Sequence, residues 1–450
     1  MARRATIFAL SSARGRAGVC VFRISGPNAG AAVEALTGAP LPPPRRAALK
    51  DVRFADGTLI DRGLVLWFPA PRSFTGEDVA ELHLHGGPAI IAAITRRLSE
   101  IEGLRPADPG EFTRRAFAND KLDLTEAEGL ADLIAAETEQ QRRLALRQTQ
   151  GALKQLYERW RTDLVRALAH LEAAIDFADE ELPNDLIARA RASAGALENE
   201  IASHLADDRR GEIVRDGFTI VILGAPNVGK SSLLNALARR DAAIVSAIPG
   251  TTRDPIEVDL DLGGYAVTLI DTAGLRETTD VVETEGIKRA RAKAQFADLR
   301  LGIVDAASQK DSRVSLELSK HDAVLINKCD IASVQTVPPI KTEAGDRLRA
   351  MRVSALTGEG IDELLAWLEA QVVARAGGSE SMPMTRARHR EALQDARAAL
   401  MRAPVALDDR ALDLAEEDLR IAARALGRIT GRVDVEDLLD VIFREFCIGK

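Results

Sequence analysis

A glycine-rich segment near the middle of the chain has the residue types and spacing of a phosphate-binding loop. Residues 224–231 read Gly-Ala-Pro-Asn-Val-Gly-Lys-Ser, between an apolar run at 218–223 and a helical pattern at 232–237. In a strand–loop–helix unit the glycines let backbone N–H groups turn inward around phosphate oxygens. Lys230 would neutralise the β- and γ-phosphates, and the Ser231 hydroxyl would bind Mg²⁺. A surface loop could hold the same residues, but the flanking strand and helix favour a nucleotide-binding site.

Four elements further along the chain indicate that the nucleotide is GTP. The segment Gly250–Asp254 offers a threonine hydroxyl to Mg²⁺, and a strand at 267–270 runs into Asp-Thr-Ala-Gly, whose aspartate and glycine N–H would reach Mg²⁺ and the γ-phosphate. A buried strand at 323–326 ends in Asn-Lys-Cys-Asp, and a last strand with a base-covering loop follows at 351–356. The carboxylate of Asp330 can accept N1–H and N2–H₂ of guanine, which adenine cannot supply. Five elements in this order predict a GTPase.

The GTPase pattern lacks two usual catalytic groups. Many GTPases orient the attacking water with a glutamine directly after Asp-x-x-Gly, but here that residue is Leu275, which has no polar side-chain atom. Glu283 could orient the water instead, although a surface carboxylate at a helix start explains this residue equally well. No arginine finger is identifiable either. A potassium ion could supply the missing positive charge, and Asn227 in the phosphate loop is a suitable oxygen ligand.

Composition limits the class of protein. The chain has 450 residues, enough for about three domains, with 46% apolar and 28% charged residues. Its formal charge of −8 argues against a strongly basic nucleic-acid-binding face. Three cysteines provide no disulfide framework, and the sequence shows neither a signal peptide nor an apolar run of the ~18 residues that a membrane span needs. We therefore predict a soluble cytoplasmic protein.

The N-terminal part predicts a mixed α+β domain. Its expected elements are strands at 6–10, 19–24, 64–68 and 79–84 and a helix at 88–98. On the last strand Glu81, His83 and His85 point to one face. Two histidines with a carboxylate could bind a metal. No further ligand is identifiable, so a solvated or substrate-facing strand edge is the favoured interpretation.

Helical periodicity dominates on both sides of the GTPase segment. A capping box formed by Thr125 and Glu128 begins a helical pattern that continues to about Arg210. The helices expected downstream, after a linker at 376–384, lie at 385–401 and 412–446. Because long amphipathic helices need partners, one helical domain split by an inserted α/β P-loop GTPase domain is the economical interpretation, and two separate helical units are the alternative. The predicted multidomain fold has an α+β domain at 1–119, helical parts at 120–215 and 374–450, and the GTPase domain at 216–373.

Five motifs lie outside the GTPase elements. They are Ser73-Phe74-Thr75-Gly76-Glu77-Asp78, His85-Gly86-Gly87, the nine residues 109–117 (Pro-Gly-Glu-Phe-Thr-Arg-Arg-Ala-Phe), Asn119-Asp120-Lys121-Leu122-Asp123-Leu124 and Phe446-Cys447-Ile448-Gly449-Lys450. With these residues the chain resembles the MnmE (TrmE) family of tRNA-modification GTPases over essentially its whole length. The resemblance implies an N-terminal domain that binds folate and dimerises. It also implies GTP hydrolysis coupled to addition of an aminomethyl-type group at carbon five of the tRNA wobble uridine, with the FAD-dependent MnmG (GidA) as partner.

The resemblance also assigns roles to individual residues. It implies that a formyl-tetrahydrofolate is bound by Arg23, Glu81, Lys121 and Lys450. Potassium, which would promote dimerisation of the GTPase domain, is assigned to Asn227, Ser246, Ile248 and Thr251, and magnesium to Ser231 and Thr252. The implied catalytic residues are Glu283, Lys230 and Asp271. The expected GTP-binding residues are Asn227, Val228, Gly229, Lys230, Ser231, Ser232, Ser246, Ala247, Ile248, Pro249, Gly250, Thr251, Thr252, Asp271, Thr272, Ala273, Gly274, Asn327, Lys328, Asp330, Ser354, Ala355 and Leu356.

Three features fit the resemblance less directly. The segment 305–323 is shorter than usual for the family, and His83 stands where members vary, so it is assigned no role. Cys447 is fourth from the end, where a prenylated cysteine would lie, but the final lysine is a poor match. A packed structural thiol is another interpretation, and the resemblance places Cys447 beside the modification site without fixing its chemistry.

Recognition of tRNA by an acidic chain needs local positive charge, because phosphate contacts normally supply much of the affinity. Two clusters, Arg142-Arg143-Arg147 and Arg386-Arg388-Arg390, could provide it, or the partner could bind the RNA. The alternative for both clusters is a solvated helix face.

Two other functions are compatible with the GTPase motifs. One is a regulatory switch for ribosome assembly, and the other is a folate-dependent one-carbon enzyme that uses GTP only as a structural ligand. A switch has no use for a folate pocket, so Arg23, Glu81, Lys121 and Lys450 separate it from the tRNA-modification GTPase.

Overall fold

The chain folds as two compact units. A computed structural model describes residues 5–13, 15–176, 185–207, 209–240, 242–244, 257–271, 297–307, 318–331, 340–342, 345–378, 382–408, 411–433, 439, 442–443, 446 and 449. The first unit comprises Met1–Ala131, Gln148–Leu197 and Asp395–Lys450, and the second comprises Asp132–Arg147 and Glu198–Gln394. Each unit therefore combines segments that are far apart in the sequence.

A six-stranded mixed sheet forms the N-terminal part of the first unit. Its elements are β1 (Thr6–Leu10), β2 (Ala17–Ser25), α1 (Ala29–Thr37), β3 (Ala48–Arg53), β4 (Leu59–Phe68), β5 (Val79–Gly86), α2 (Pro88–Ser99), β6 (Leu104–Pro106) and α3 (Glu111–Ala118). The strand order is β3-β4-β5-β2-β1-β6, antiparallel except for the parallel pair β1–β6. The four strands and the helix expected here are confirmed, with longer bounds for three of the strands.

The two faces of this sheet are covered differently. Alternation along the strands sends Phe8, Phe22 and Leu82 into the main core together with the buried faces of α1 and α2. On the opposite face, Ile7 and Ala9 of β1 pack against Phe112 of α3. Helix α3 therefore places the 109–117 motif on one face of the sheet. The side chains of β2 that point away from the main core lie on the same face.

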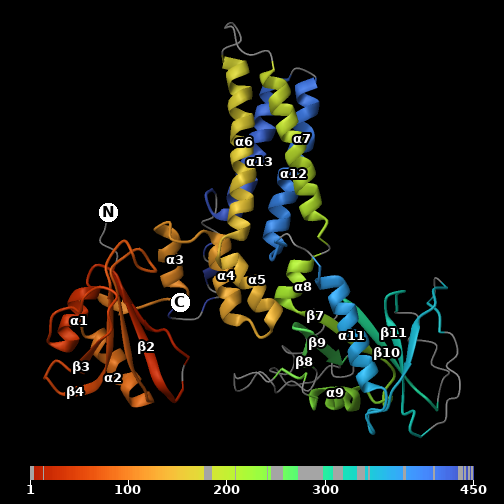
Figure 1. Cartoon of the computed structure of the whole chain (residues 1–450), viewed down its shortest axis with the longest axis horizontal. Helices are drawn as coiled ribbons and strands as arrows, with labels where there is room; N and C mark the ends of the chain where they lie inside the picture. Colours follow the sequence, from red (N-terminus) through yellow and green to blue (C-terminus); the bar gives the residue numbers. More distant parts are fainter. Residues whose placement is uncertain are drawn as a thin grey trace, which may run out of the picture. The chain divides into compact units, whose positions relative to one another are not determined.

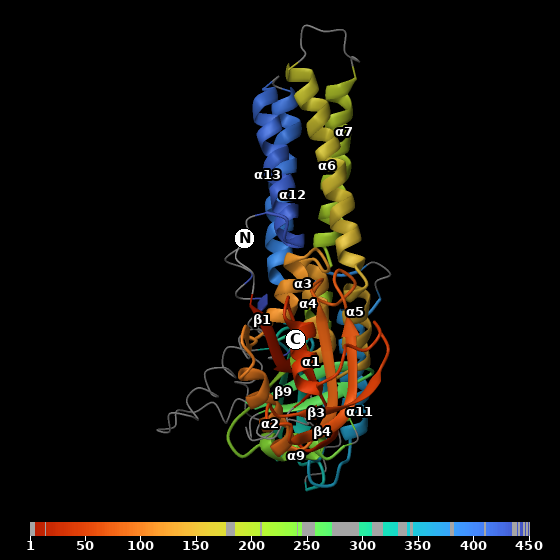
Figure 2. The same cartoon turned by 90° about the vertical axis from the view of Figure 1, so that its left-hand side faces the viewer.

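Long helices make up the rest of the first unit and part of the second. They are α4 (Leu124–Ala135), α5 (Glu139–Thr149), α6 (Ala152–Asp176), α7 (Leu186–Leu205), α8 (Arg210–Asp216), α12 (Ala387–Asp408) and α13 (Leu412–Thr430). Helices α6, α7, α12 and α13 run side by side as a bundle (Figures 1 and 2). The buried faces of α6 and α13 pack together, with Trp160, Leu164 and Leu426 almost fully enclosed. Residues from both sides of the GTPase segment thus share one core.

The capping box that begins the helical region lies two residues earlier than expected. The Asp123 Oδ1 atom accepts the Glu126 N–H at 2.8 Å, and the Glu126 carboxylate accepts the Asp123 N–H at 2.8 Å. This reciprocal pair is the arrangement of a capping box. Thr125 and Glu128 are buried inside the helix instead. The prediction was wrong because Asp123 and Glu126 have the same three-residue spacing as Thr125 and Glu128. With Asp123 in the capping position, the Thr125 side chain is buried instead.

Two other boundaries differ from the sequence prediction. Helix α13 ends at Thr430 rather than continuing to residue 446, because Gly431 takes a left-handed conformation with φ 88° and its N–H returns to the Gly427 carbonyl. The segment read as a linker is partly packed. Met382 and Met384 are 5% and 0% exposed, since these apolar side chains enter the core of the second unit.

A second six-stranded sheet lies in the second unit. Its elements are β7 (Phe218–Leu223), α9 (Lys230–Ala238), β8 (Glu257–Leu262), β9 (Tyr265–Asp271), β10 (Leu299–Asp305), β11 (Ala323–Asn327), β12 (Arg349–Arg352) and α11 (Ile361–Ala376). The order is β12-β11-β10-β7-β9-β8, and only β8 is antiparallel to its neighbour. Ligands bind such sheets beyond the carboxyl ends of the strands, which is where the predicted motifs lie.

In chain order this sheet lies between α8 and α12, and α11 extends to Ala376. The insertion into a single helical domain and the boundaries at residues 119, 215 and 373 stay predictions. None of the helices that the structure describes has the length and apolarity needed to cross a membrane.

Candidate active site

The phosphate loop follows the central strand β7 and requires glycine at two positions. A Cβ atom on Gly224 would lie 2.6 Å from the Ile303 carbonyl oxygen, and one on Gly229 would lie 2.2 Å from the Asn327 side-chain nitrogen. Gly229 has φ 99° and Asn227 has φ 65°, both in the left-handed region. The backbone between them is therefore free to curl at the N-terminus of α9, as an anion-binding loop requires.

The expected phosphate and magnesium residues lie together at this loop. The buried Lys230 ammonium donates to the carbonyls of Gly224 and Ala225 at 2.8 and 2.9 Å. The Ser231 hydroxyl donates to the Asp271 carboxylate at 3.0 Å. Parallel pairing of β7 with β9 makes this contact possible, because it aligns Ile222 with Asp271. A hydroxyl beside a buried carboxylate is an oxygen pair that suits Mg²⁺.

The predicted guanine-recognition residues are tied to the phosphate loop and to each other. The Asn327 amide donates to the Val228 carbonyl at 2.8 Å, and its oxygen accepts the Ala355 N–H at 3.1 Å. The Ser354 hydroxyl donates to the Asp330 carboxylate at 2.6 Å. Strand β12 ends at Arg352, so Ser354 already belongs to the turn that follows. The phosphate loop, the loop after β11 and the turn after β12 are separate in the sequence but lie together at one edge of the sheet.

Asp305 belongs to this edge although no motif contains it. It ends β10 and pairs in register with Asn327. Its carboxylate lies 2.7 Å from the Lys328 ammonium, which also donates to the Asn227 carbonyl at 3.0 Å. The hydrogen bond from Lys328 lowers the pKa of the Asp305 carboxyl below its usual value. The sequence signal for it was a charged residue at the end of an apolar run.

Several predicted site residues lie outside the described residues. They are Ser246, Ala247, Ile248, Pro249, Gly250, Thr251, Thr252, Thr272, Ala273, Gly274 and Glu283, together with Cys447 and Lys450. Of the remaining members, Ser232 and Leu356 are exposed, and Leu356 is 84% exposed in the loop after Ser354. Asn227 is exposed as well, so its side chain is available to a ligand.

The predicted folate residues Arg23 and Glu81 form an ion pair on the sheet of the first unit. Their closest nitrogen and oxygen atoms are 2.9 Å apart, on the neighbouring strands β2 and β5. The Arg23 guanidinium lies over the rings of Phe74 and Phe112, at 5.2 and 5.8 Å from their centroids. Cation–π contacts of this kind hold a charged group in place at the surface.

Lys121 borders the same loop as Phe74. A Cβ on Gly76 would lie 3.1 Å from the Lys121 Cε atom, so the lysine stem passes directly over this glycine. His83 lies 3.3 Å from the other Glu81 oxygen, and His85 contacts Asp61 at 2.8 Å. Among the residues that the structure describes, no group of three or more His, Cys, Asp or Glu could hold a metal ion. The H-x-H segment therefore gains no support as a metal site.

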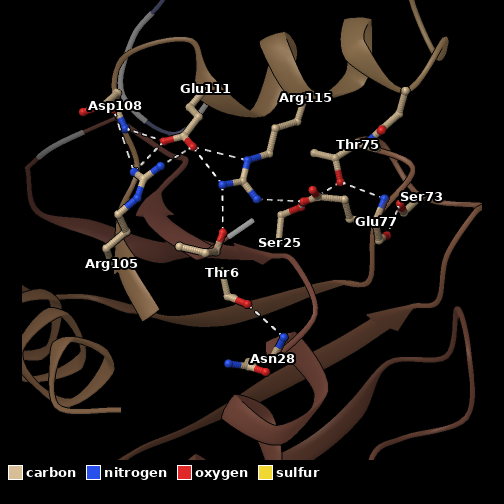
Figure 3. Close-up of polar contacts among 12 residues, drawn as sticks. Thr6, Ser25, Asn28, Ser73, Thr75, Glu77, Arg105, Asp108, Glu111 and Arg115 are labelled. Atoms are coloured by element: carbon tan, nitrogen blue, oxygen red, sulfur yellow. Dashed lines mark hydrogen bonds and ion pairs between the residues drawn. The ribbon is translucent and has the colours of Figure 1, made fainter. Parts of the chain in front are cut away.

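Arg115 is the centre of a buried charge network beneath this face (Figure 3). It is 5% exposed and contacts the carboxylates of Glu77 and Glu111 at 2.9 and 2.8 Å, and the Ala5 carbonyl at 2.8 Å. Burial alone would raise the pKa of the Glu111 carboxyl, but hydrogen bonds from Arg105, Arg115 and the Asp108 N–H hold it below its usual value. The sequence motifs contained both acids without showing that they share one arginine.

Comparisons with known proteins agree over the whole chain. A family model described as the MnmE helical domain matches residues 124–447, and one described as the N-terminus of the GTP-binding protein TrmE matches residues 6–121. A relative from Parvibaculum lavamentivorans, named tRNA modification GTPase MnmE, is 57% identical over 99% of this chain and 100% of its own. The chain belongs to the MnmE family. Relatives of the same name from Paramagnetospirillum magneticum and Rhodospirillum rubrum are 54% and 52% identical over 99% of both chains.

The C-terminal motif of the MnmE family lies partly within the described structure. The Ser11 hydroxyl donates to the Gly449 carbonyl at 2.9 Å, and a Cβ on Gly449 would lie 2.3 Å from the Leu10 carbonyl. Gly449 therefore rests against the end of β1, in the same unit as Arg23. Its neighbours Cys447 and Lys450 are outside the described residues.

One basic cluster considered for tRNA binding is engaged within the protein. Arg386 is 8% exposed and bonds to Asp132 at 2.7 Å, and Arg390 bonds to Asp207 and Glu212 at 2.8 and 3.1 Å. Neither guanidinium is available to phosphate, and neither belongs to a solvated face. In the other cluster, Arg142 and Arg143 are exposed and pair with Glu139 on the same helix.

Proposed function

We propose that this chain is a potassium-activated GTP hydrolase of the MnmE family that modifies the tRNA wobble uridine. With an FAD-dependent partner, MnmG (GidA), it would add an aminomethyl-type group at carbon five, in the cytoplasm and as a homodimer. The observation that carries the proposal is the preassembled edge in which Asn327 contacts both the phosphate loop and the Ala355 backbone. Family membership and relatives named tRNA modification GTPase support the RNA substrate.

Selection of guanine rests on Asp330 in this proposal. The Ser354 hydroxyl occupies one lone pair of Asp330 Oδ1, which fixes the carboxylate plane and leaves the remaining lone pairs for N1–H and N2–H₂. Adenine presents no matching pair of donors, so it would leave the carboxylate partly unsatisfied beneath the base. The Lys328 stem, fixed by Asp305 and Asn227, would lie against the base.

Magnesium and potassium would bind on either side of the phosphate loop. Ser231 and Asp271 provide the oxygen atoms for Mg²⁺, with Thr252 as the further ligand that the family pattern assigns. The exposed Asn227 side chain fits a potassium ion beside the phosphates, with Ser246, Ile248 and Thr251 as the other assigned ligands. A bound potassium ion would supply the positive charge that GTPases with an arginine finger obtain from arginine. Lys230 would neutralise the phosphates, and Glu283 would orient the attacking water.

A formyl-tetrahydrofolate would occupy the Arg23 face of the N-terminal sheet. Arg23 and Lys121 suit the carboxylates of a folate, and Glu81 can accept hydrogen bonds from its ring N–H groups. Lys450 is the fourth assigned residue, and Gly449 beside it contacts Ser11. The folate would supply a one-carbon unit, and these residues would bind and orient it. The free buried thiols of Cys20 and Cys329 are compatible with the proposed cytoplasmic location, which is a reducing compartment.

Two experiments test the proposal. GTP hydrolysis is measured in potassium and in sodium at matched ionic strength, where faster turnover in potassium is expected, and equal rates would remove the potassium claim. An Asn227→Ala variant should lose the potassium response. Mass analysis of wobble uridines from cells lacking this chain should show loss of the modification, and unchanged tRNA would refute the RNA function.

Base selection is tested separately with Asp330→Asn. The amide would donate to the extra carbonyl of xanthine, so this variant should prefer xanthosine triphosphate over GTP. Retention of the GTP preference would contradict the assigned role of Asp330.

A further inference from the structure

Three sequence motifs of the N-terminal domain converge on one loop. Residues 73–78 lie in the connection between β4 and β5, and two residues of this loop are held by partners from one other part of the chain. The Asn119 side chain donates to the Thr75 carbonyl at 2.6 Å, and Arg115 pairs with Glu77 at 2.9 Å. Both of these partners belong to α3 or to the turn directly after it. The loop is therefore fastened to α3 at two points.

The inner side of the loop is also satisfied. The buried Ser25 hydroxyl lies 2.7 Å from the Thr75 hydroxyl and 2.8 Å from the Glu77 carboxylate. The Ser73 hydroxyl donates to the Glu77 carbonyl. Figure 3 shows Ser25, Thr75 and Glu77 in a row that ends at Arg115. Because the polar side chains of Ser73, Thr75 and Glu77 all have partners, these contacts favour a single arrangement of the loop.

This fixed loop contacts both cations of the candidate folate site. Phe74 lies under the Arg23 guanidinium, while Gly76 lies against the stem of Lys121. Gly76 has φ 76°, and its lack of a side chain is what allows the lysine to pass so closely. Phe112, the other ring at Arg23, is carried by the same helix as Arg115. Moving the loop away from α3 would separate the supports of Arg23 and Lys121.

We propose that Glu77, Arg115 and Asn119 are positioning residues for folate binding. They hold the loop 73–78 on α3, and the loop in turn sets the separation and direction of the Arg23 and Lys121 cations. This inference rests on the proposed folate function. The three residues touch no ligand themselves. Their effect is on affinity, because a pair of cations fixed in advance loses less conformational freedom when a polyanion binds.

The test is calorimetric titration of the full chain with 5-formyl-tetrahydrofolate. Asn119→Ala removes a single hydrogen bond to the loop and leaves no buried charge, and it should weaken binding about five- to tenfold. Glu77→Gln should weaken binding at least as much. The matched control is Arg105→Gln, which alters the same network at Glu111 but touches no part of the loop. Its affinity should stay within twofold of the wild type.

A second measurement separates positioning from general destabilisation. The kcat and KM for GTP should be unchanged in Asn119→Ala, since the hydrolysis site lies in the other unit. If the wild type and Lys121→Met give equal binding or none, the folate function fails. If Lys121→Met weakens binding but Asn119→Ala and Glu77→Gln do not, the positioning role is overturned. Equal losses in Asn119→Ala and Arg105→Gln would also overturn it, because they would indicate a nonspecific effect.

Discussion

Replacing Asp123 by asparagine tests how the structure holds a carboxylate at the start of α4. One oxygen of Asp123 accepts the Glu126 N–H and the Thr125 hydroxyl, both at 2.8 Å. The other oxygen is buried and has no hydrogen-bond partner among the described residues. Burial raises the pKa of Asp123 from 3.8 to about 6, and the nearby Glu126 carboxylate adds to the increase, while Lys154 opposes it. Asparagine is an equally good N-cap and carries no charge.

The sign of the effect follows from the direction of the pKa shift. A raised pKa means that the folded state binds the Asp123 proton more tightly than the unfolded state does. This contribution to stability is fully present below about pH 4 and is lost as the pH rises through 6. Between pH 4.5 and 7.5 the loss is about 2 kcal/mol for a pKa of about 6. The Asp123→Asn variant lacks this loss, so its stability relative to the wild type should increase by about that amount over this range.

Urea unfolding of the full chain, followed by Trp160 fluorescence, measures the difference. The chain has three tryptophans, and replacing Trp67 and Trp367 by phenylalanine leaves the buried Trp160 of α6 as the reporter for this unit. Asp120→Asn is the matched control, because Asp120 is exposed and its left-handed conformation tolerates asparagine. The control should follow the wild type at every pH. A difference between Asp123→Asn and wild type that stays constant from pH 4.5 to 7.5 would refute the reasoning.

Three further substitutions test other parts of the structure. Asp305→Asn should weaken GTP and GDP binding equally, by about two- to fivefold, and leave kcat unchanged, because Asp305 would act on the nucleotide through Lys328. A fluorescent-nucleotide titration that shows different losses for the two nucleotides would contradict this. Arg115→Met leaves Glu77 without its ion-pair partner and should lower the free energy of unfolding by about 3 kcal/mol, measured by urea titration with Trp67 as reporter. Gly211→Ala places a Cβ 1.9 Å from the Met384 carbonyl oxygen and should lower the free energy of unfolding by about 1–3 kcal/mol in thermal unfolding. The control is Gly195→Ala, whose added Cβ meets no atom within 4 Å and which should be neutral or stabilising. Equal unfolding midpoints for the two variants would show that the Gly211 backbone moves freely.

The position of the predicted GTPase residues at one sheet edge could be inferred from the sequence because these residues follow strands. Lys230, Asp271 and Asp330 each lie in or after a short apolar run, so chain order alone places them at one sheet edge. Asp305 was missed because its role depends on the parallel register of β10 and β11, which sets it opposite Asn327. Register is a property of strand pairing, and no local motif encodes it.

The N-terminal site was harder to predict for a similar reason. Glu77 and Arg115 are 38 residues apart, and only the packing of α3 on the sheet brings them together. The predicted end of the last long helix was wrong because of a single residue. Gly431 takes a left-handed conformation and ends α13 there. The arginines at 386 and 390 looked like a solvent-facing cluster, since the acids that neutralise them come from distant parts of the sequence.

The contacts of Asn327 have a thermodynamic consequence for nucleotide binding. Its amide joins the phosphate loop to the base-covering loop within the protein itself. Part of the conformational entropy of these loops is therefore lost during folding, before any ligand arrives. Binding of the guanine moiety should show only a small heat-capacity change, since little additional apolar surface is buried. GDP and GTP will then differ in affinity chiefly through contacts made to the third phosphate.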